Sequence, residues 1–235
     1  MSYQDNFMVQ ELSAKILESQ KAFLRKVYGW MTLGLLITTI SSLYFFTSGA
    51  YILVLNTIGV LVLFILQIGL VVALSGWINK MNAAVATTLF IFYSALTGVT
   101  LSSIFLIYNI GTIVNTFFTA SITFGALSIF GFTTKKNLTA WGSFFFMGLV
   151  GILIAMFINF FLSSNALNFV ISVIGVIVFA GLTAYDTQKL KEMHLVQIEG
   201  KEIASKSSIL GALVLYLDFI NLFLMLLRLF GGGRK

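Results

Sequence analysis

The chain has 235 residues, of which 59% are hydrophobic and only 9% are charged, and its mean hydropathy is +1.01. Soluble domains carry roughly 25% charged residues, so this composition excludes a water-soluble fold. The net charge of +6 does not indicate nucleic-acid binding, because the basic residues are scattered, and the absence of cysteine excludes disulfides and thiolate sites.

Residues 1–26 form a polar tail of mixed charge. The tail contains no apolar stretch followed by a small-residue cleavage site, so we expect no removable signal peptide. The first hydrophobic segment should then act as the insertion signal. We therefore expect an N-terminal tail over 1–26, a transmembrane domain over 27–230 and a short C-terminal tail over 231–235.

Seven hydrophobic runs follow the tail, and each is about 20 residues long, which suffices to cross roughly 30 Å of hydrocarbon as a helix. They are Val27 to Phe46, Tyr51 to Leu74, Ala83 to Ile107, Thr112 to Phe132, Ala140 to Leu162, Ala166 to Gln188 and Ser208 to Phe230. The sequence therefore predicts an all-α, polytopic membrane bundle with seven transmembrane helices.

Lysine and arginine residues alternate between the loops of this bundle. They occupy the tail and the second, fourth and sixth loops, whereas the first, third and fifth loops contain none. Cytoplasmic loops retain positive charge, so we expect a cytoplasmic N-terminus. Seven spans place Arg228, Arg234 and Lys235 on the opposite side, against this rule. A last segment that dips in and returns would leave six spans, but we expect seven.

The segment from Lys189 to Lys206 is the longest predicted loop and carries charges of both signs. It is interpreted as a solvated connector. His194 lies in it beside Glu192, but a lone histidine lacks the partners that a metal site needs.

Asp218 lies about ten residues into the last hydrophobic run. An aspartate deep in the bilayer costs about 2.5–3.5 kcal/mol on insertion scales, and such residues usually face the bundle interior or a water-filled cavity and carry function. The alternative is a packing role, in which Asp218 is protonated or hydrogen-bonded to a neighbour such as Asn221.

Asp186 is the other carboxylate within or bordering the spans. The charge alternation places Asp186 and Asp218 in the cytoplasmic half of consecutive helices, where they can meet. Two such carboxylates in a low-dielectric site would share one proton. Loss of that proton would leave two repelling charges, relieved by helix separation or by a hard cation such as calcium. The pair is therefore a candidate pH-gated cation site.

Four stretches carry a resemblance to a known family. They are Tyr93 to Gly98 with Leu101 to Phe105, Thr133 to Leu138, Val178 to Gln188 and Leu215 to Phe223. With these stretches the chain resembles the transmembrane Bax inhibitor motif family, in its bacterial inner-membrane branch.

The resemblance implies a central seventh helix surrounded by six others, in the cell inner membrane. It also implies a pH-sensitive calcium leak gated by an aspartate pair, here Asp186 and Asp218. Bacterial relatives are linked to an ATP-dependent membrane protease, and eukaryotic ones to suppression of cell death. Two residues depart from the family pattern: Gln67 stands where many relatives have an acidic residue in the second helix, and Asn137 where many have Asp. Asn221 and Gln67 are the candidate supporting polar residues of the aspartate pair.

Two other classes of function compete with a leak channel. A regulatory membrane protein that modulates a protease or a stress response needs no conduction, and no motif excludes it. An intramembrane aspartyl protease also uses two aspartates, but the residues before Asp218 lack the glycine of its GxGD motif. We therefore expect no enzyme and no cofactor, with lipid, protons, calcium and possible protease contacts as partners.

Overall fold

The computed structural model describes residues 3–54, 56–193 and 201–231. Within these residues the chain is helical and contains no strand. The helices are α1 (Tyr3–Thr47), α2 (Tyr51–Val54), α3 (Thr57–Gly76), η1 (Ile78–Lys80), α4 (Ala83–Leu101), α5 (Ile104–Ile107), α6 (Ile110–Thr133), α7 (Thr139–Leu162), α8 (Asn165–Glu192) and α9 (Lys201–Phe230).

Polar residues at the breaks start several of these helices. The side chains of Asn56, Asn82 and Asn109 accept hydrogen bonds from the backbone N–H groups three residues later, at 2.8–2.9 Å. Ser164 caps α8 in the same way at 3.3 Å. These caps satisfy backbone donors that a helix start leaves without partners, so short turns suffice between long apolar helices.

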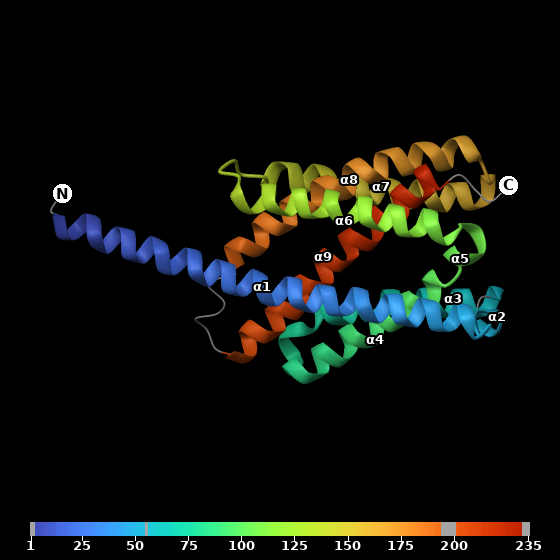
Figure 1. The fold of residues 1–235 in the computed structure, drawn as a ribbon, viewed down its shortest axis with the longest axis horizontal. Helices are drawn as coiled ribbons and strands as arrows, with labels where there is room; N and C mark the ends of the chain where they lie inside the picture. Colours follow the sequence, from blue (N-terminus) through green and yellow to red (C-terminus); the bar gives the residue numbers. More distant parts are fainter. Residues whose placement is uncertain (1–2, 55, 194–200, 232–235) are drawn as a thin grey trace.

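The long helices form two groups of three, with α9 between them (Figure 1). In the first group α1 and α3 pack on α4, and in the second α6 and α7 pack on α8. Helix α9 runs obliquely across both groups and contacts α8, α1, α6 and α4. Its most apolar window is 72% buried, against 11–44% for the other six spans. The last helix is therefore the core of the bundle, as predicted.

Glycine allows the closest approaches inside each group. A Cβ atom at Gly98 would collide with the backbone carbonyl of Thr38, where α4 crosses α1. A Cβ atom at Gly131 would collide with the backbone of Ala184, where α6 crosses α8. Small residues that bring helix backbones together are typical of packing in membranes, because lipid supplies no hydrophobic force between helices.

In the part of the chain that the structure describes, seven helices are long and apolar enough to cross a membrane, which confirms the predicted number of spans. The last of them, α9, is one uninterrupted helix and does not turn back within the bundle. Two boundaries differ from the prediction. The tail continues the first span as a single helix from Tyr3, and the third run is interrupted at Ser102 and Ser103, where the serine hydroxyls bond to carbonyls of the preceding turn.

The predicted loop from Lys189 to Lys206 is shorter than expected, because α8 continues to Glu192 and α9 begins at Lys201. His194 lies outside the described residues. The start of α9 is attached to the turn after η1, because the Lys206 Nζ atom donates a hydrogen bond of 3.0 Å to the Met81 carbonyl. We call this end of the bundle, with Lys80, Lys135 and Lys189, the basic end, and the opposite end the C-terminal end.

Candidate functional site: a buried aspartate pair

Asp186 on α8 and Asp218 on α9 lie side by side, with their carboxyl groups in hydrogen-bonding contact. The antiparallel packing of the two helices explains this meeting. Gly175 faces Met225 on one side of the pair, and Leu190 faces Gly211 on the other. Asp186 and Asp218 fall between these contacts, about 9 Å from the end of α8.

The environment of the two carboxyl groups differs. Asp218 is only 5% exposed, and its Oδ2 atom is buried without a hydrogen bond from any N–H or hydroxyl group in the described part of the chain. Asp186 is half-buried and has the exposed Lys189 as its electrostatic neighbour one turn later. Asp186 is therefore partly accessible at the basic end, next to the positive charge of Lys189, whereas Asp218 is enclosed by the bundle.

A polar clamp holds the α6–α7 connection against α8 beside the pair. The Gln188 side chain accepts a hydrogen bond from the Leu138 N–H and donates one to the Lys136 carbonyl, both at 2.8 Å. The Lys191 Nζ atom donates to the Phe132 carbonyl at 2.9 Å. This clamp joins two of the four stretches that carry the family resemblance. Sequence reasoning missed it, although Gln188 is the last residue of the sixth predicted span.

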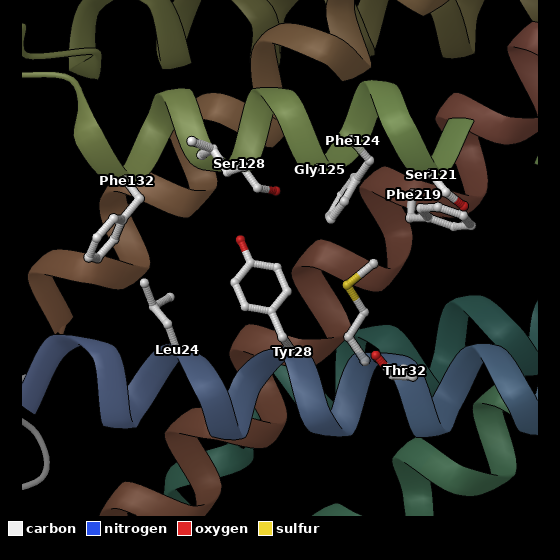
Figure 2. A pocket seen from close by; sticks show the side chains of 11 residues that line it. Leu24, Tyr28, Thr32, Ser121, Phe124, Gly125, Ser128, Phe132 and Phe219 are labelled. Atoms are coloured by element: carbon white, nitrogen blue, oxygen red, sulfur yellow. The ribbon is translucent and has the colours of Figure 1, made fainter. Parts of the chain in front are cut away.

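A cavity of about 460 Å³ lies between α1 and α6, and Phe219 of α9 is part of its lining (Figure 2). The Tyr28 hydroxyl is directed from α1 toward Ser128 on α6 in Figure 2, and it lies 3.3 Å from the Thr187 Oγ1 atom. The buried Ser128 Oγ atom lines the cavity and has no partner among the described residues. Thr187 follows Asp186 in the chain, and Phe219, which also lines the cavity, follows Asp218.

The opposite side of α9 carries a second hydroxyl cluster. The Tyr216 hydroxyl is fully buried and lies 2.6 Å from the Thr38 Oγ1 atom, which donates to backbone carbonyls at 2.9 Å. Thr97 also hydrogen-bonds to Tyr216. These contacts fix α9 against α1 and α4 and so fix the direction in which Asp218 points.

The two other predicted polar residues lie apart from the pair's contacts. The Asn221 Nδ2 atom donates at 2.8 Å to the Leu217 carbonyl of its own helix. The Gln67 Nε2 atom donates at 3.1 Å to the Thr100 Oγ1 atom, so Gln67 joins α3 to α4. Neither side chain hydrogen-bonds to Asp186 or Asp218 within the described residues, and the structure supports a local packing role for both.

The described residues contain no group of three or more histidine, cysteine or carboxylate side chains that could hold a metal ion. Calcium takes 6–8 oxygen ligands. The two carboxyl groups alone fall short of that number, and backbone carbonyls, hydroxyl groups or water would have to supply the rest.

Comparison with known proteins gives the family. The model of the family described as inhibitor of apoptosis-promoting Bax1 matches residues 20–235. The chain belongs to the Bax inhibitor-1 family. It is 51% identical to the inner membrane protein YbhL of Escherichia coli over 218 residues, covering 91% of this chain and 93% of YbhL. A protein of Borreliella burgdorferi is 46% identical over 91% of the chain and 93% of its own length.

A protein of Rickettsia prowazekii is 42% identical and covers 92% of both chains. Each of these three alignments covers more than nine-tenths of both chains. The chain is accordingly a multi-pass membrane protein, similar to one from a bacterial inner membrane.

Proposed function

We propose that this Bax inhibitor-1 family protein is a pH-sensitive calcium leak channel in which Asp186 and Asp218 form the gate. The observation that carries the proposal is the contact between these two carboxyl groups on neighbouring helices, one of them in the core of the bundle. Buried ionisable side chains in membrane helices commonly mark ion or proton pathways.

A shared proton holds the two helices together. With one proton on the pair, a carboxylic acid donates to a carboxylate and α8 stays against α9. Without it, the two negative charges repel; for unit charges at a typical ion-pair separation of about 4 Å, the repulsion is about 4 kcal/mol at an effective dielectric constant of about 20. Separation of the helices or entry of a cation relieves this repulsion. Lys189 is exposed, so its charge is largely screened by water.

The cavity between α1 and α6 supplies the approach to the gate. The Tyr28 and Ser128 hydroxyls face into it, and polar groups of this kind are what a buried water molecule needs. Helices α1 and α6 pack on α9 and on their own groups more than on each other. In this proposal a proton from the basic end enters the cavity and passes along the Tyr28 hydroxyl, 3.3 Å from the Thr187 Oγ1 atom, to the neighbouring Asp186.

The proposed orientation puts the basic end in the cytoplasm. The Lys and Arg residues of the even-numbered loops support it, because these residues resist translocation. With that orientation the pair lies in the cytoplasmic half of the membrane and senses cytoplasmic pH. Flux should rise as cytoplasmic pH rises, since deprotonation opens the gate.

The test is calcium flux into proteoliposomes that contain a calcium-sensitive dye, measured across a range of pH. Asp218→Asn keeps the size and hydrogen-bonding capacity of the side chain but cannot ionise. We expect it to abolish the pH-dependent flux. Glu192→Gln is the matched control, because Glu192 is an exposed carboxylate at the end of the same α8 helix. It should leave the flux unchanged.

If the Asp218→Asn variant shows the same flux as wild type at every pH, the proposal that the aspartate pair is the gate is contradicted. Absence of flux in the wild-type protein itself would contradict the channel. Thermal unfolding of each variant in detergent shows whether the protein is folded before flux is compared.

A second candidate function is regulation of another membrane protein, such as an ATP-dependent protease. Helix α1 favours it, because its first turns project beyond the bundle as a helical arm (Figure 1). The arm carries the exposed pair Glu11 and Lys15, with a 2.7 Å salt bridge. Pull-down from membranes, with and without residues 1–13, tests this function. Co-purification of a protease that depends on the arm, and survives Asp218→Asn, would favour regulation over conduction.

We propose no enzymatic activity. Peptide-bond hydrolysis by two aspartates needs an extended substrate strand between them, whereas Asp186 and Asp218 contact each other within uninterrupted helices. Cleavage of a transmembrane peptide by the purified protein, lost in Asp218→Asn, would contradict this proposal.

A further inference from the structure

A polar cavity of about 850 Å³ lies at the C-terminal end of the bundle, far along α8 and α9 from the aspartate pair. Its volume is within the range of about 300–1,000 Å³ that ligand sites occupy. Helices α7, α8 and α9 contribute its polar lining, which includes Asn159, Ser172 and Arg228. The proposed gate uses none of these residues.

The register of α8 against α9 builds this cavity. Gly175 lets the Met225 side chain approach α8 closely, and Ser172 and Arg228 follow one turn further toward the C-terminal end. Asn165, Asn168 and Ser172 are spaced by three and four residues, so they share one face of α8. Asn159 on α7 closes the other side and is itself buried.

The charged side chains at this end of the bundle are basic and not acidic. The described segments that meet there, 47–54, 56–57, 101–112, 160–168 and 226–231, contain no aspartate or glutamate. Arg228 has no salt bridge within the described residues. Helix α8 also begins here, and its N-terminus adds partial positive charge. The cavity therefore disfavours a cation and favours an anion.

The rim of the cavity is apolar. Phe160 and Phe169 are 78% and 60% exposed, and they line the cavity together with Met156. A ligand that fills the cavity thus meets the buried Asn159 and Ser172 inside, the exposed Arg228 guanidinium group at the opening, and the exposed aromatic side chains at the edge. This combination matches an amphiphile that carries a phosphate and acyl chains.

We propose that this cavity binds an anionic phospholipid, with the guanidinium group of Arg228 on the phosphate and the acyl chains along Phe160 and Phe169. Arginine binds phosphate through paired, charge-assisted hydrogen bonds. The lipid also explains why a cation is tolerated at the end of the chain where the charge pattern otherwise avoids one. The proposal is independent of the aspartate gate.

The competing explanation is local, because an arginine in the last turn of a helix interacts favourably with the helix dipole and carbonyls. That interaction gives no preference between lipids. The two explanations therefore differ in whether the purified protein prefers an anionic lipid over a zwitterionic one of the same chain length.

The experiment measures lipid retention by native mass spectrometry of the full chain. Delipidated protein is reconstituted with equal amounts of phosphatidylglycerol and phosphatidylcholine. We expect wild type to retain phosphatidylglycerol preferentially, and Arg228→Gln to lose about tenfold in that preference, as for one lost charge-assisted contact. Arg25→Gln is the matched control, since Arg25 is an exposed arginine on α1 at the basic end.

Equal retention of both lipids by wild type, or an unchanged preference in Arg228→Gln, would overturn the proposal. Complete displacement of phosphatidylglycerol by inorganic phosphate would show that the cavity binds free phosphate and not a lipid headgroup, and would also overturn the proposal. Asn168→Leu alters the exposed wall of the cavity and should also weaken the preference, which keeps the test valid if Arg228→Gln does not fold. Asp218→Asn should retain the wild-type preference, so failure here is distinguishable from failure of the gate.

Discussion

At the scale of single residues, the Tyr28 hydroxyl lies next to the aspartate pair through its contact with Thr187. It bridges α1 to Thr187 on α8, directly after Asp186, and it faces the cavity between α1 and α6. A hydrogen bond of this kind contributes about 0.5–1.5 kcal/mol, and in the proposed gate it would stabilise the closed arrangement. Its loss should make the separation of α8 from its neighbours easier.

Tyr28→Phe should therefore shift the midpoint of the pH-dependent calcium flux downward by about 0.4–1 pH unit, because 1.36 kcal/mol corresponds to one unit. The sign follows from the gate: with the closed state weakened, less deprotonation is needed to open it. Flux from proteoliposomes across pH measures the shift. Tyr44→Phe is the control, since Tyr44 is an exposed tyrosine of the same helix. An identical shift in both variants would contradict a specific role for Tyr28.

Asp218 could be predicted from the sequence because a carboxylate in a long apolar run is costly, and that cost depends on the residue alone. Tyr28, Thr187 and Gln188 could not be predicted in the same way. Each is an ordinary residue near a helix end, and its role depends on which atoms lie opposite, such as the Leu138 N–H that donates to Gln188. The sequence contains both residues of each hydrogen bond, but it does not show which residues bond to each other.

At the scale of helices, Gly131 determines how closely α6 approaches α8. A Cβ atom there would collide with the Ala184 backbone, which cannot move aside as a flexible side chain can. Ala184 lies two residues before Asp186, so this contact also sets the position of the pair. Helix separation at this crossing should weaken the whole second group of helices.

Gly131→Ala should lower the thermal stability of the purified protein by several degrees, whereas Gly125→Ala should leave it unchanged or raise it slightly. Gly125 is a residue of the same helix with open space around its Cβ position, and alanine is the better helix former by about 1 kcal/mol. Thermal unfolding in detergent, followed by size-exclusion chromatography, measures the difference. Equal stability of the two variants would show that α6 can move away from α8 at little cost.

The helices themselves could be predicted, but their packing could not. The stretches Phe157 to Leu162 and Phe219 to Leu224 are nearly identical in sequence. Phe157 is 67% exposed and faces lipid, whereas Phe219 is 3% exposed in the core. Acyl chains are as apolar as a protein interior, so hydrophobicity does not distinguish the two environments. The central place of α9 came from the family resemblance and was confirmed by burial.

At the scale of the whole molecule, the two groups of three helices have the same internal arrangement, and each contains an odd number of long spans. The second group therefore crosses the membrane in the opposite direction to the first. Helix α9 contacts both groups, and its two sides carry different chemistry: Tyr216 bonds toward α1 and α4, and Asp218 faces α8. A movement of one group of helices relative to the other would therefore change the distance between the Asp186 and Asp218 carboxyl groups.

The orientation of this assembly in the membrane is the prediction on which the sensing of cytoplasmic pH depends. The chain has no cysteine, so single cysteines can be introduced without a background signal. Asn79→Cys lies in η1 at the basic end, and Ser48→Cys lies after α1 at the opposite end; both positions are exposed. A membrane-impermeant maleimide should label Ser48→Cys in intact cells and Asn79→Cys only after lysis. The reverse pattern would place the basic end outside, and the pair would then respond to external pH.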